Sequence, residues 1–272
     1  MASTSVTSAA VFIRTVISAL AQRAFEAQLV MAARSSRWTA EDGSTIQKGL
    51  ISNITPTAVV SGDAIVYTAT TENSVSMSIN RHFYAGVDIE DITKVQANLD
   101  LAKEYASKLS YSLKRQLDTD LTGLYSGLSK TAGTLNGGFD DNALRFAVRQ
   151  LDDDDVTEED RTFAFRPIVS QEMLGIDKYV DQSFLGELAK KGPLQTGLIG
   201  QRYGLAFFKT TQINTTGGQN NLVFQREAFS YAIQKPLVVE KMARTNLTTP
   251  VLASMLWGRV ESRDVAAVLM RS

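Results

Sequence analysis

The chain has 272 residues, of which 44% are hydrophobic and 21% are charged. This composition is typical of a globular protein with a sizeable core, and it excludes a disordered or membrane-spanning chain. Its 28 basic residues nearly balance 29 acidic ones, so no strong overall field draws the chain to nucleic acid or to an anionic membrane. The sequence has no cysteine, which excludes disulfides, thiolate metal ligands and cysteine nucleophiles.

Residues 1–43 are expected to form an N-terminal arm that contains an amphipathic helix. Between Ala9 and Ala33 the apolar residues recur every three to five positions, as in Val11, Val16, Leu20, Ala24, Ala27 and Met31. Charges interrupt this stretch at Arg14, Arg23 and Glu26, so we expect neither a transmembrane helix nor a secretory signal. An acid-poor start that carries arginine is also compatible with an organellar presequence.

Residues 44–82 are expected to form an extended, two-stranded loop. The β-prone runs are Ile46–Ile54, Ala64–Thr70 and the alternating segment Val75–Ile79. These runs are rich in Ser, Thr and Asn and carry too little apolar surface to build a core alone, so we predict a protruding pair of strands. Lys48 lies in this loop and is interpreted as a surface residue.

Residues 83–136 contain the clearest element, a long helix predicted over Asp91–Thr122. Ten apolar residues follow one another at spacings of three or four, namely Ile92, Val95, Leu99, Ala102, Ala106, Leu109, Leu113, Leu117, Leu121 and Leu124. Asp88, Glu90 and Asp91 are expected at its start, where carboxylates favour the helix dipole. A helix of this length spans about 50 Å, which is typical of a structural spine and not of a site.

The remainder is predicted to be a mixed α/β region, 137–227, followed by returning strands, 228–272. The glycine-rich stretch Gly133–Gly138 is interpreted as a hinge. Beyond it the patterns predict a helix over Asn142–Leu151, a strand from Phe163 to Val169, a broken helix over Gln171–Ala189, a strand over Tyr203–Gln212 and a polar turn over Asn214–Asn221. Alternating apolar residues from Phe229 onward predict long strands laid against the spine helix, before a short run over Val265–Met270.

A search for chemistry finds no convergent set of reactive groups. His82 is the only histidine, and no Gly-x-Ser-x-Gly elbow accompanies a serine, so it is interpreted as a turn residue between strand and helix. One histidine with carboxylates is also a poor zinc site. Gly197, Gly200 and Gly204 have neither the dinucleotide-binding nor the phosphate-loop spacing, and Ser129 stands where a phosphate loop before Lys130 needs glycine.

The largest charge run has seven acids among the nine residues Asp152–Asp160. It lacks the turn glycine and ligand order of an EF-hand, so we interpret it as a solvated loop, with weak divalent binding as the alternative. No basic stripe with interleaved aromatics predicts specific nucleic-acid readout. The arginines Arg14, Arg23, Arg34 and Arg37 make the N-terminal arm positive, which favours an inner position facing DNA or a scaffold, although solvation of a helix surface explains them equally well. No catalytic, cofactor-binding or metal-binding residue is expected, and the chain is not expected to be an enzyme.

The order of these parts resembles the major capsid protein of tailed bacteriophages, the Hong Kong 97 type. The segments that carry the resemblance are Asp88–Asp91 running through Leu99–Ala102 to Leu113–Asp118, then Thr196–Phe208, Arg226–Ala232 and Trp257–Val265. The first is similar to the family's spine helix, the second to its glycine-punctuated strand entry, and the last two to its C-terminal strands. The resemblance covers nearly the whole chain and rests on the order of the predicted elements and on their residue patterns, not on one specific motif.

This resemblance implies an α+β subunit with an N-terminal arm, an extended loop, a peripheral domain that carries the spine helix, and an axial domain. It implies a virion protein, assembled in the host cytoplasm, whose hexamers and pentamers tile an icosahedral shell around double-stranded DNA held non-specifically at the inner surface. The expected partners are further copies, a scaffolding protein and the portal, with no membrane and no cofactor. Because no long extension precedes Val6, the scaffold is expected to be a separate protein.

The sequence is also compatible with three other interpretations. An encapsulin-type compartment shell shares the fold and differs in cargo, so the contents of a particle separate it from a virus. A cytoplasmic α/β enzyme would turn over a substrate as a small oligomer. A tail or connector protein of the same virion would form only rings or tubes.

Overall fold

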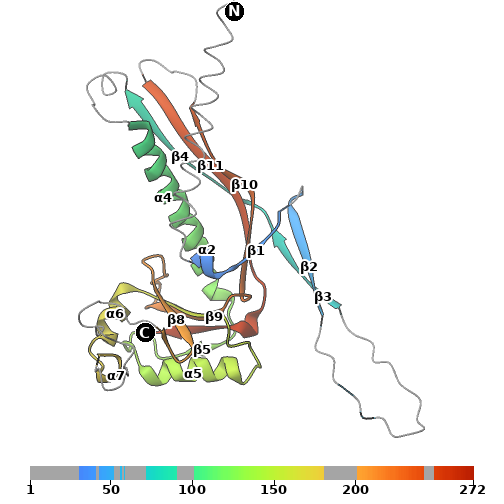
Figure 1. The fold of residues 1–272 in the computed structure, drawn as a ribbon, viewed down its shortest axis with the longest axis vertical. Coiled ribbons are helices and arrows are strands. Elements are labelled where there is room, and N and C mark those ends of the chain that lie inside the picture. The colour runs from blue at the N-terminus through green and yellow to red at the C-terminus, as the bar shows by residue number, and fades with distance from the viewer. Residues whose placement is uncertain are drawn as a thin grey trace, which may run out of the picture.

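The structure is a computed structural model that describes residues 31–40, 43–51, 56, 58, 72–90, 101–180, 201–241 and 248–272. In Figure 1 a four-stranded sheet occupies the upper part of the molecule and a six-stranded sheet the lower part. A two-stranded hairpin projects sideways from the region where they meet. The α+β class expected from the sequence is confirmed.

The four-stranded sheet has the order β1-β10-β11-β4. Its strands are β1 (Ser36–Trp38), β10 (Phe229–Lys241), β11 (Thr248–Glu261) and β4 (Arg81–Glu90). β1 runs parallel to β10, and the other pairs are antiparallel. The long C-terminal strands predicted from period-two alternation are therefore confirmed, whereas β1 was missed because three residues are too short for a pattern.

Helix α4 (Leu101–Thr122) covers one face of this sheet (Figure 1). The buried residues of α4 are spaced at three and four, and they include Ala106, Leu109, Leu113, Leu117 and Leu121. The long predicted helix is confirmed over this range, and its expected first turns at 91–100 lie outside the described residues. Asp88 and Glu90 were wrongly assigned to the helix start, because both belong to β4, where they pair with Pro250 and Thr248.

One buried polar contact joins α4 to the sheet. The indole nitrogen of Trp257 donates to Oδ2 of Asp120 at 3.1 Å, and Gln116 donates to Oδ1 at 3.2 Å. Trp257 is fully buried and stacks on Phe83 with ring centroids 4.9 Å apart. This contact fixes the position of the helix along the strands, because a buried indole N–H must find an acceptor.

The six-stranded sheet has the order β5-β12-β9-β6-β8-β7. Its strands are β5 (Thr131–Ala132), β12 (Ala267–Arg271), β9 (Asn220–Gln225), β6 (Arg161–Phe165), β8 (Leu205–Lys209) and β7 (Gln201–Arg202). Helix α5 (Asp141–Asp152) packs beside β12 and β5, with Ala143, Leu144, Ala147 and Leu151 buried. The predicted helix over Asn142–Leu151 is thus confirmed, and its N-cap Asp140 accepts from the amide of Asn142.

Three predictions for this region were wrong. Ile168 and Val169 lie in helix α6 (Pro167–Met173), not in a strand, because Pro167 starts a helix at its first turn. β9 begins at Asn220, inside the expected polar turn. β12 does not join the returning strands but pairs with β9 and β5 in the other sheet. A second short helix, α7 (Asp177–Val180), follows α6, and the rest of the helix expected up to Ala189 lies outside the described residues.

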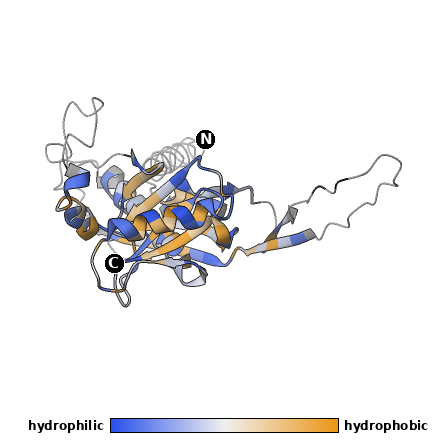
Figure 2. Cartoon of the chain, turned by 90° about the horizontal axis from the view of Figure 1, so that it is seen from below, coloured by the Kyte–Doolittle hydropathy of each residue, from blue (hydrophilic) through white to orange (hydrophobic). Residues whose placement is uncertain are grey.

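The hairpin consists of β2 (Thr45–Ile51) and β3 (Glu72–Ser78), which pair antiparallel from Thr45 opposite Ser78 to Ile51 opposite Glu72. The protruding strand pair predicted from the sequence is confirmed over these residues, and Ala64–Thr70 lies outside the described ones. Figure 2 shows orange, hydrophobic strands gathered in the body while the hairpin extends away from it. Among its described residues, the hairpin packs on the body at its base.

Candidate functional site

The base of the hairpin is held by a small apolar cluster of its own. Trp38 from β1, Met77 from β3 and Ala232 from β10 are buried, with exposed fractions of 9%, 0% and 0%. Ile46 and Val75 of the hairpin pack against them. The other described side chains of the hairpin strands are mostly exposed, as at Asn73, Ser74 and Ser76 of β3 and at Gln47 and Lys48 of β2. Three elements distant in sequence thus fix where the hairpin leaves the body.

The backbone of β11 approaches the hairpin base at a glycine. A Cβ atom on Gly258 would lie 2.8 Å from the carbonyl oxygen of Ser78 and 3.2 Å from Cα of Ile79. No side chain fits at this distance without a shift of the backbone. On the other side of the base, the amide of Ile79 donates to the carbonyl of Ser44 at 2.8 Å, which closes the hairpin.

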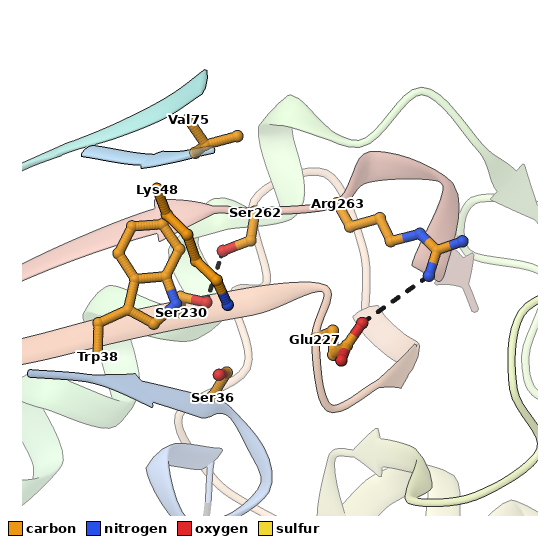
Figure 3. Close-up of a pocket in the computed structure, with 8 residues that line it drawn as sticks. All are labelled: Ser36, Trp38, Lys48, Val75, Glu227, Ser230, Ser262 and Arg263. Carbon is orange, nitrogen blue, oxygen red and sulfur yellow. Dashed lines mark hydrogen bonds and ion pairs between the residues drawn. The ribbon is translucent and has the colours of Figure 1, made fainter. Parts of the chain in front are cut away.

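A small polar pocket of about 70 Å³ lies between the hairpin base and the body (Figure 3). It is lined by Ser36, Trp38, Lys48, Val75, Glu227, Ser230, Ser262 and Arg263. The ammonium of Lys48 lies 5.6 Å from the centre of the Trp38 ring, and Arg263 pairs with Glu227 at 3.8 Å. Most polar side chains here already have partners within the chain: Arg263 pairs with Glu227, and the hydroxyl of Ser262 donates to that of Ser230. The pocket therefore resembles a packing gap between elements more than a ligand site.

The face of the four-stranded sheet opposite α4 is partly apolar. Along β4 the residues alternate, so Phe83, Ala85 and Val87 pack on the core while His82, Tyr84 and Asp88 face away. Tyr84 is 74% exposed, and it pairs with Ser254 of β11. The neighbouring residues Val238, Leu252 and Leu256 are half-buried. An exposed face of this kind is typical of a surface that meets a partner.

A buried carboxylate organises the far end of the six-stranded sheet. Asp141, at the start of α5, accepts hydrogen bonds from the hydroxyls of Tyr179 at 2.7 Å and Tyr203 at 2.8 Å, and pairs with Lys178 at 3.1 Å and Arg145 at 3.2 Å. Burial alone would raise the pKa of Asp141, but these donors hold it below its ordinary value. Burial and the adjacent carboxylate raise the pKa of Tyr179.

This arrangement makes Asp141 an anchor and not a reactive group, because its carboxylate is already saturated with donors. It ties α5 to α7 and to the turn between β7 and β8, where Tyr203 and Gly204 both have positive φ angles of 51° and 73°. No local pattern predicts that these residues meet, because Asp141, Tyr179 and Tyr203 are far apart in the chain.

The residues considered for catalysis do not converge. His82 is not a turn residue as expected; it lies within β4, opposite Leu256, with an exposed side chain. Gly204 lies in the β7–β8 turn with a positive φ angle, and Gly197 and Gly200 lie outside the described residues. Among the residues that the structure describes, no group of three His, Asp or Glu side chains is placed to hold a metal ion.

The acidic run 152–160 is held by basic side chains of the body. Lys130 forms an ion pair with Asp154, and the buried Arg161 pairs with Asp152 at 2.6 Å while donating to the carbonyls of Thr157 and Val156. The other acids of the run are exposed. Of the arm's arginines, Arg34 lies 4.1 Å from the centre of the Phe208 ring and Arg37 is exposed, while Arg14 and Arg23 lie outside the described residues.

Comparisons with known proteins give one consistent result. No protein-family model and no curated protein matches the chain in sequence. A structure of Mycobacterium phage Che8 is similar with a TM-score of 0.74 and 19% identity, over 89% of this chain and 91% of that one. The capsid of the cyanophage P-SCSP1u gives 0.73 and 17%, over 89% and 88%. The mature capsid of bacteriophage PhiM1 gives 0.68 and 13%, over 90% and 87%.

The chain therefore has the α+β fold of phage capsid proteins, as the resemblance in the sequence implied. Nearly the whole length of each compared chain takes part, so the likeness extends across the hairpin-bearing body and not to a single module. Within the described residues, no helix is both long and apolar enough to span a membrane.

Proposed function

We propose that this chain is the major capsid protein of a tailed phage, which assembles with copies of itself into the icosahedral shell around the viral DNA. The observation that carries the proposal is a fold shared with the capsid of the cyanophage P-SCSP1u, over 89% of this chain at a TM-score of 0.73. The described residues add a hairpin whose apolar contacts are confined to its base, as a subunit built to lie over its neighbours requires.

The parts take the following roles in this proposal. α4 is the spine helix, and with the four-stranded sheet it forms the peripheral domain, 83–136 and 228–272 without β5 and β12. The six-stranded sheet forms the axial domain, which is 137–227 together with β5 and β12, since both strands pair within that sheet. The hairpin is the extended loop, 44–82, and residues 1–43 are the N-terminal arm.

In this proposal the subunits assemble through surfaces that are exposed in the single chain. The exposed side of the hairpin and the partly apolar face around Tyr84 are two different surfaces of one subunit, so a contact between them on neighbouring copies would be heterologous. A heterologous contact of this kind, repeated around an axis, closes into rings. Hexamers and pentamers of the subunit would give the shell.

The remaining partners are assigned by the same proposal. A separate scaffolding protein would direct the curvature, and the portal would occupy one vertex. Packaged DNA would contact the inner surface without sequence specificity, since the chain has a formal net charge of −1 and no strongly basic field. The protein would be part of the virion, after assembly in the host cytoplasm, and would have no catalytic role.

Electron microscopy tests this proposal. The chain is expressed with and without the genes beside it, and the particulate fraction is imaged in negative stain. Closed icosahedral particles or capsomer rings are expected. A small, monodisperse species under every condition, with the candidate scaffold included, would overturn the shell proposal. Particles that enclose protein cargo and never DNA would instead identify the chain as a compartment shell protein of the encapsulin type.

A further inference from the structure

The two sheets are joined at one compact junction. Within residues 101–272 the described chain passes between them at three places: from α4 to β5 through the 3-10 helix η1 (Gly123–Gly127), from β9 to β10 at 226–228, and from β11 to β12 through η3 (Asp264–Ala266). Any change in the angle between the sheets must act on these three crossings. Their mutual contacts therefore determine how rigid the body is.

The crossings are hydrogen-bonded to one another. The carbonyl of Ala228, in the second crossing, accepts from the amides of Ser262 at 2.8 Å and Arg263 at 3.3 Å, in the third. Asp264 in the third crossing accepts from the amide of Ser129, at the end of the first, at 2.9 Å, and also from its hydroxyl. The next residue of the first crossing, Lys130, donates to the carbonyl of Val265 at 3.5 Å.

A pair of carboxyl groups lies at the centre of this network. Glu261 ends β11 and is hydrogen-bonded to Asp264, three residues later. Gly127 of the first crossing also lies against the Glu261 carboxyl group, which would have to move aside for a side chain at 127. Two carboxylates are both acceptors and repel each other, so a hydrogen bond between Glu261 and Asp264 requires a proton on one of them.

The surroundings place that proton on Glu261. Burial raises the pKa of Glu261 to about 7, and the hydrogen bond and negative charge of Asp264 act in the same direction. Burial would also raise the pKa of Asp264, but the hydroxyl and amide of Ser129 hold it below its ordinary value. The charged groups that face the pair from the elements around it are Lys130, and beyond it Asp154 and Asp153.

We propose that the hydrogen-bonded Glu261–Asp264 pair is a pH-sensitive latch on the junction between the two sheets. It is closed while Glu261 is protonated and donates to Asp264, and it weakens when Glu261 ionises. This property belongs to the single chain and does not depend on whether the chain forms shells.

The direction of the effect follows from the raised pKa of Glu261. In an opened junction Glu261 would titrate near its ordinary value of 4.5, whereas in the closed junction it holds its proton up to about 7. The latch is therefore fully effective below the lower value and loses strength as pH rises between the two, by at most about tenfold per pH unit. Above the upper value no further loss is expected. The lowered pKa of Asp264 gives the opposite dependence, but only at lower pH.

Hydrogen exchange with mass spectrometry, read as protection factors that remove the intrinsic effect of pH, tests the latch on the full chain. We expect protection in peptides covering Ser129, Ser262 and Leu269 to fall severalfold from about pH 5 to about pH 7.5, with α5 unchanged. Glu261→Gln, whose amide donates to Asp264 without titrating, should keep the high protection at both values. Glu159→Gln, an exposed glutamate, is the matched control and should behave as the wild type. Sedimentation at each pH confirms that the assembly state is the same.

Two results would overturn the proposal. One is equal protection of these peptides in the wild type at both pH values, and the other is a pH-dependent fall of the same size in Glu261→Gln. Should that variant not fold, Glu261→Asp replaces it, because the shorter side chain withdraws from Asp264 and must move the fall to lower pH. An unmoved fall would equally contradict the latch.

Discussion

The body of this subunit buries many apolar side chains, whereas its hairpin buries few. The body places the leucine stripe of α4 and the inner faces of two sheets in one continuous core, with Leu117, Leu121 and Trp257 fully buried. The hairpin has three fully or nearly buried residues around its base, one of which, Met77, is its own. The body thus has a large core of its own, whereas the described part of the hairpin buries apolar side chains only at its base.

Because of this difference, substitutions in the body and in the hairpin should have different effects. A substitution in the core of the body should lower the stability of the subunit, and assembly should fail only because folding does. A substitution in the hairpin should leave the subunit folded and change what it can form with its neighbours. The predictions below test this separation, beginning with the largest expected effect on stability.

Leu117→Ala should lower the free energy of unfolding by about 2 to 5 kcal/mol, because it leaves a cavity under α4 where the side chain is fully buried. Urea unfolding followed by circular dichroism measures the loss. Ser112→Ala, on the exposed side of the same helix, is the matched control and should change stability by less than about 0.5 kcal/mol. Equal stabilities of the two variants would show that α4 is not part of the body's core.

Asp120→Ala should destabilise the subunit by about 1 to 3 kcal/mol, because it leaves the buried indole N–H of Trp257 without its acceptor. Asp120→Asn retains one acceptor oxygen, although Gln116 and Trp257 each require one, so its effect should be intermediate. The same urea titration, combined with near-ultraviolet circular dichroism of the tryptophan, measures both variants. A larger loss for Asn than for Ala would contradict the role of this hydrogen bond.

Gly258→Val should cost about 1 to 3 kcal/mol and displace the hairpin, because a side chain at 258 collides with the backbone of Ser78 and Ile79. The yield of assembled particles should fall further than the loss of stability explains. Gly49→Ala is the control for stability: it lies on β2 with open space around its Cβ position, so it should leave thermal unfolding unchanged. Thermal unfolding and particle yield by sedimentation decide between these outcomes.

Lys48→Ala should have the smallest effect, a loss of about 0.5 to 1 kcal/mol, because it removes the ammonium that lies over the ring of Trp38. Lys48→Arg keeps a cation over the ring and should retain most of that stability. Thermal unfolding followed by the fluorescence of the tryptophans measures the difference. A loss equal to that of Leu117→Ala would mean that the hairpin base is part of the main core after all.

Sequence reasoning succeeded where a regular pattern is long enough to be read. The leucines of α4 and the alternating residues of β10 and β11 define their own period, and the polar composition of β2 and β3 indicates a strand pair outside a core. It failed where the answer depends on a partner distant in the chain. β12 has the same apolar character as the returning strands, and only pairing with β9 and β5 puts it in the other sheet.

The same limit applies to the functional features. The exposed hairpin could be predicted from its composition, because an apolar deficit is a local property. The pocket at its base, the Asp141 anchor and the junction around Glu261 could not, because each brings together residues from three or more separate segments. Glu261 and Asp264 are close in sequence, but Ser129, which determines which of them keeps the proton, comes from another crossing.

The central claim is that the body folds alone and the hairpin exists for the neighbouring subunits. The test replaces 45–78 by a short glycine-serine linker, expresses the shortened and the unaltered chain each with the neighbouring genes, including the candidate scaffold, and images the products by negative-stain electron microscopy. Closed shells are expected from the unaltered chain and, from the shortened one, a folded subunit that forms none. Closed shells from the shortened chain would contradict this claim.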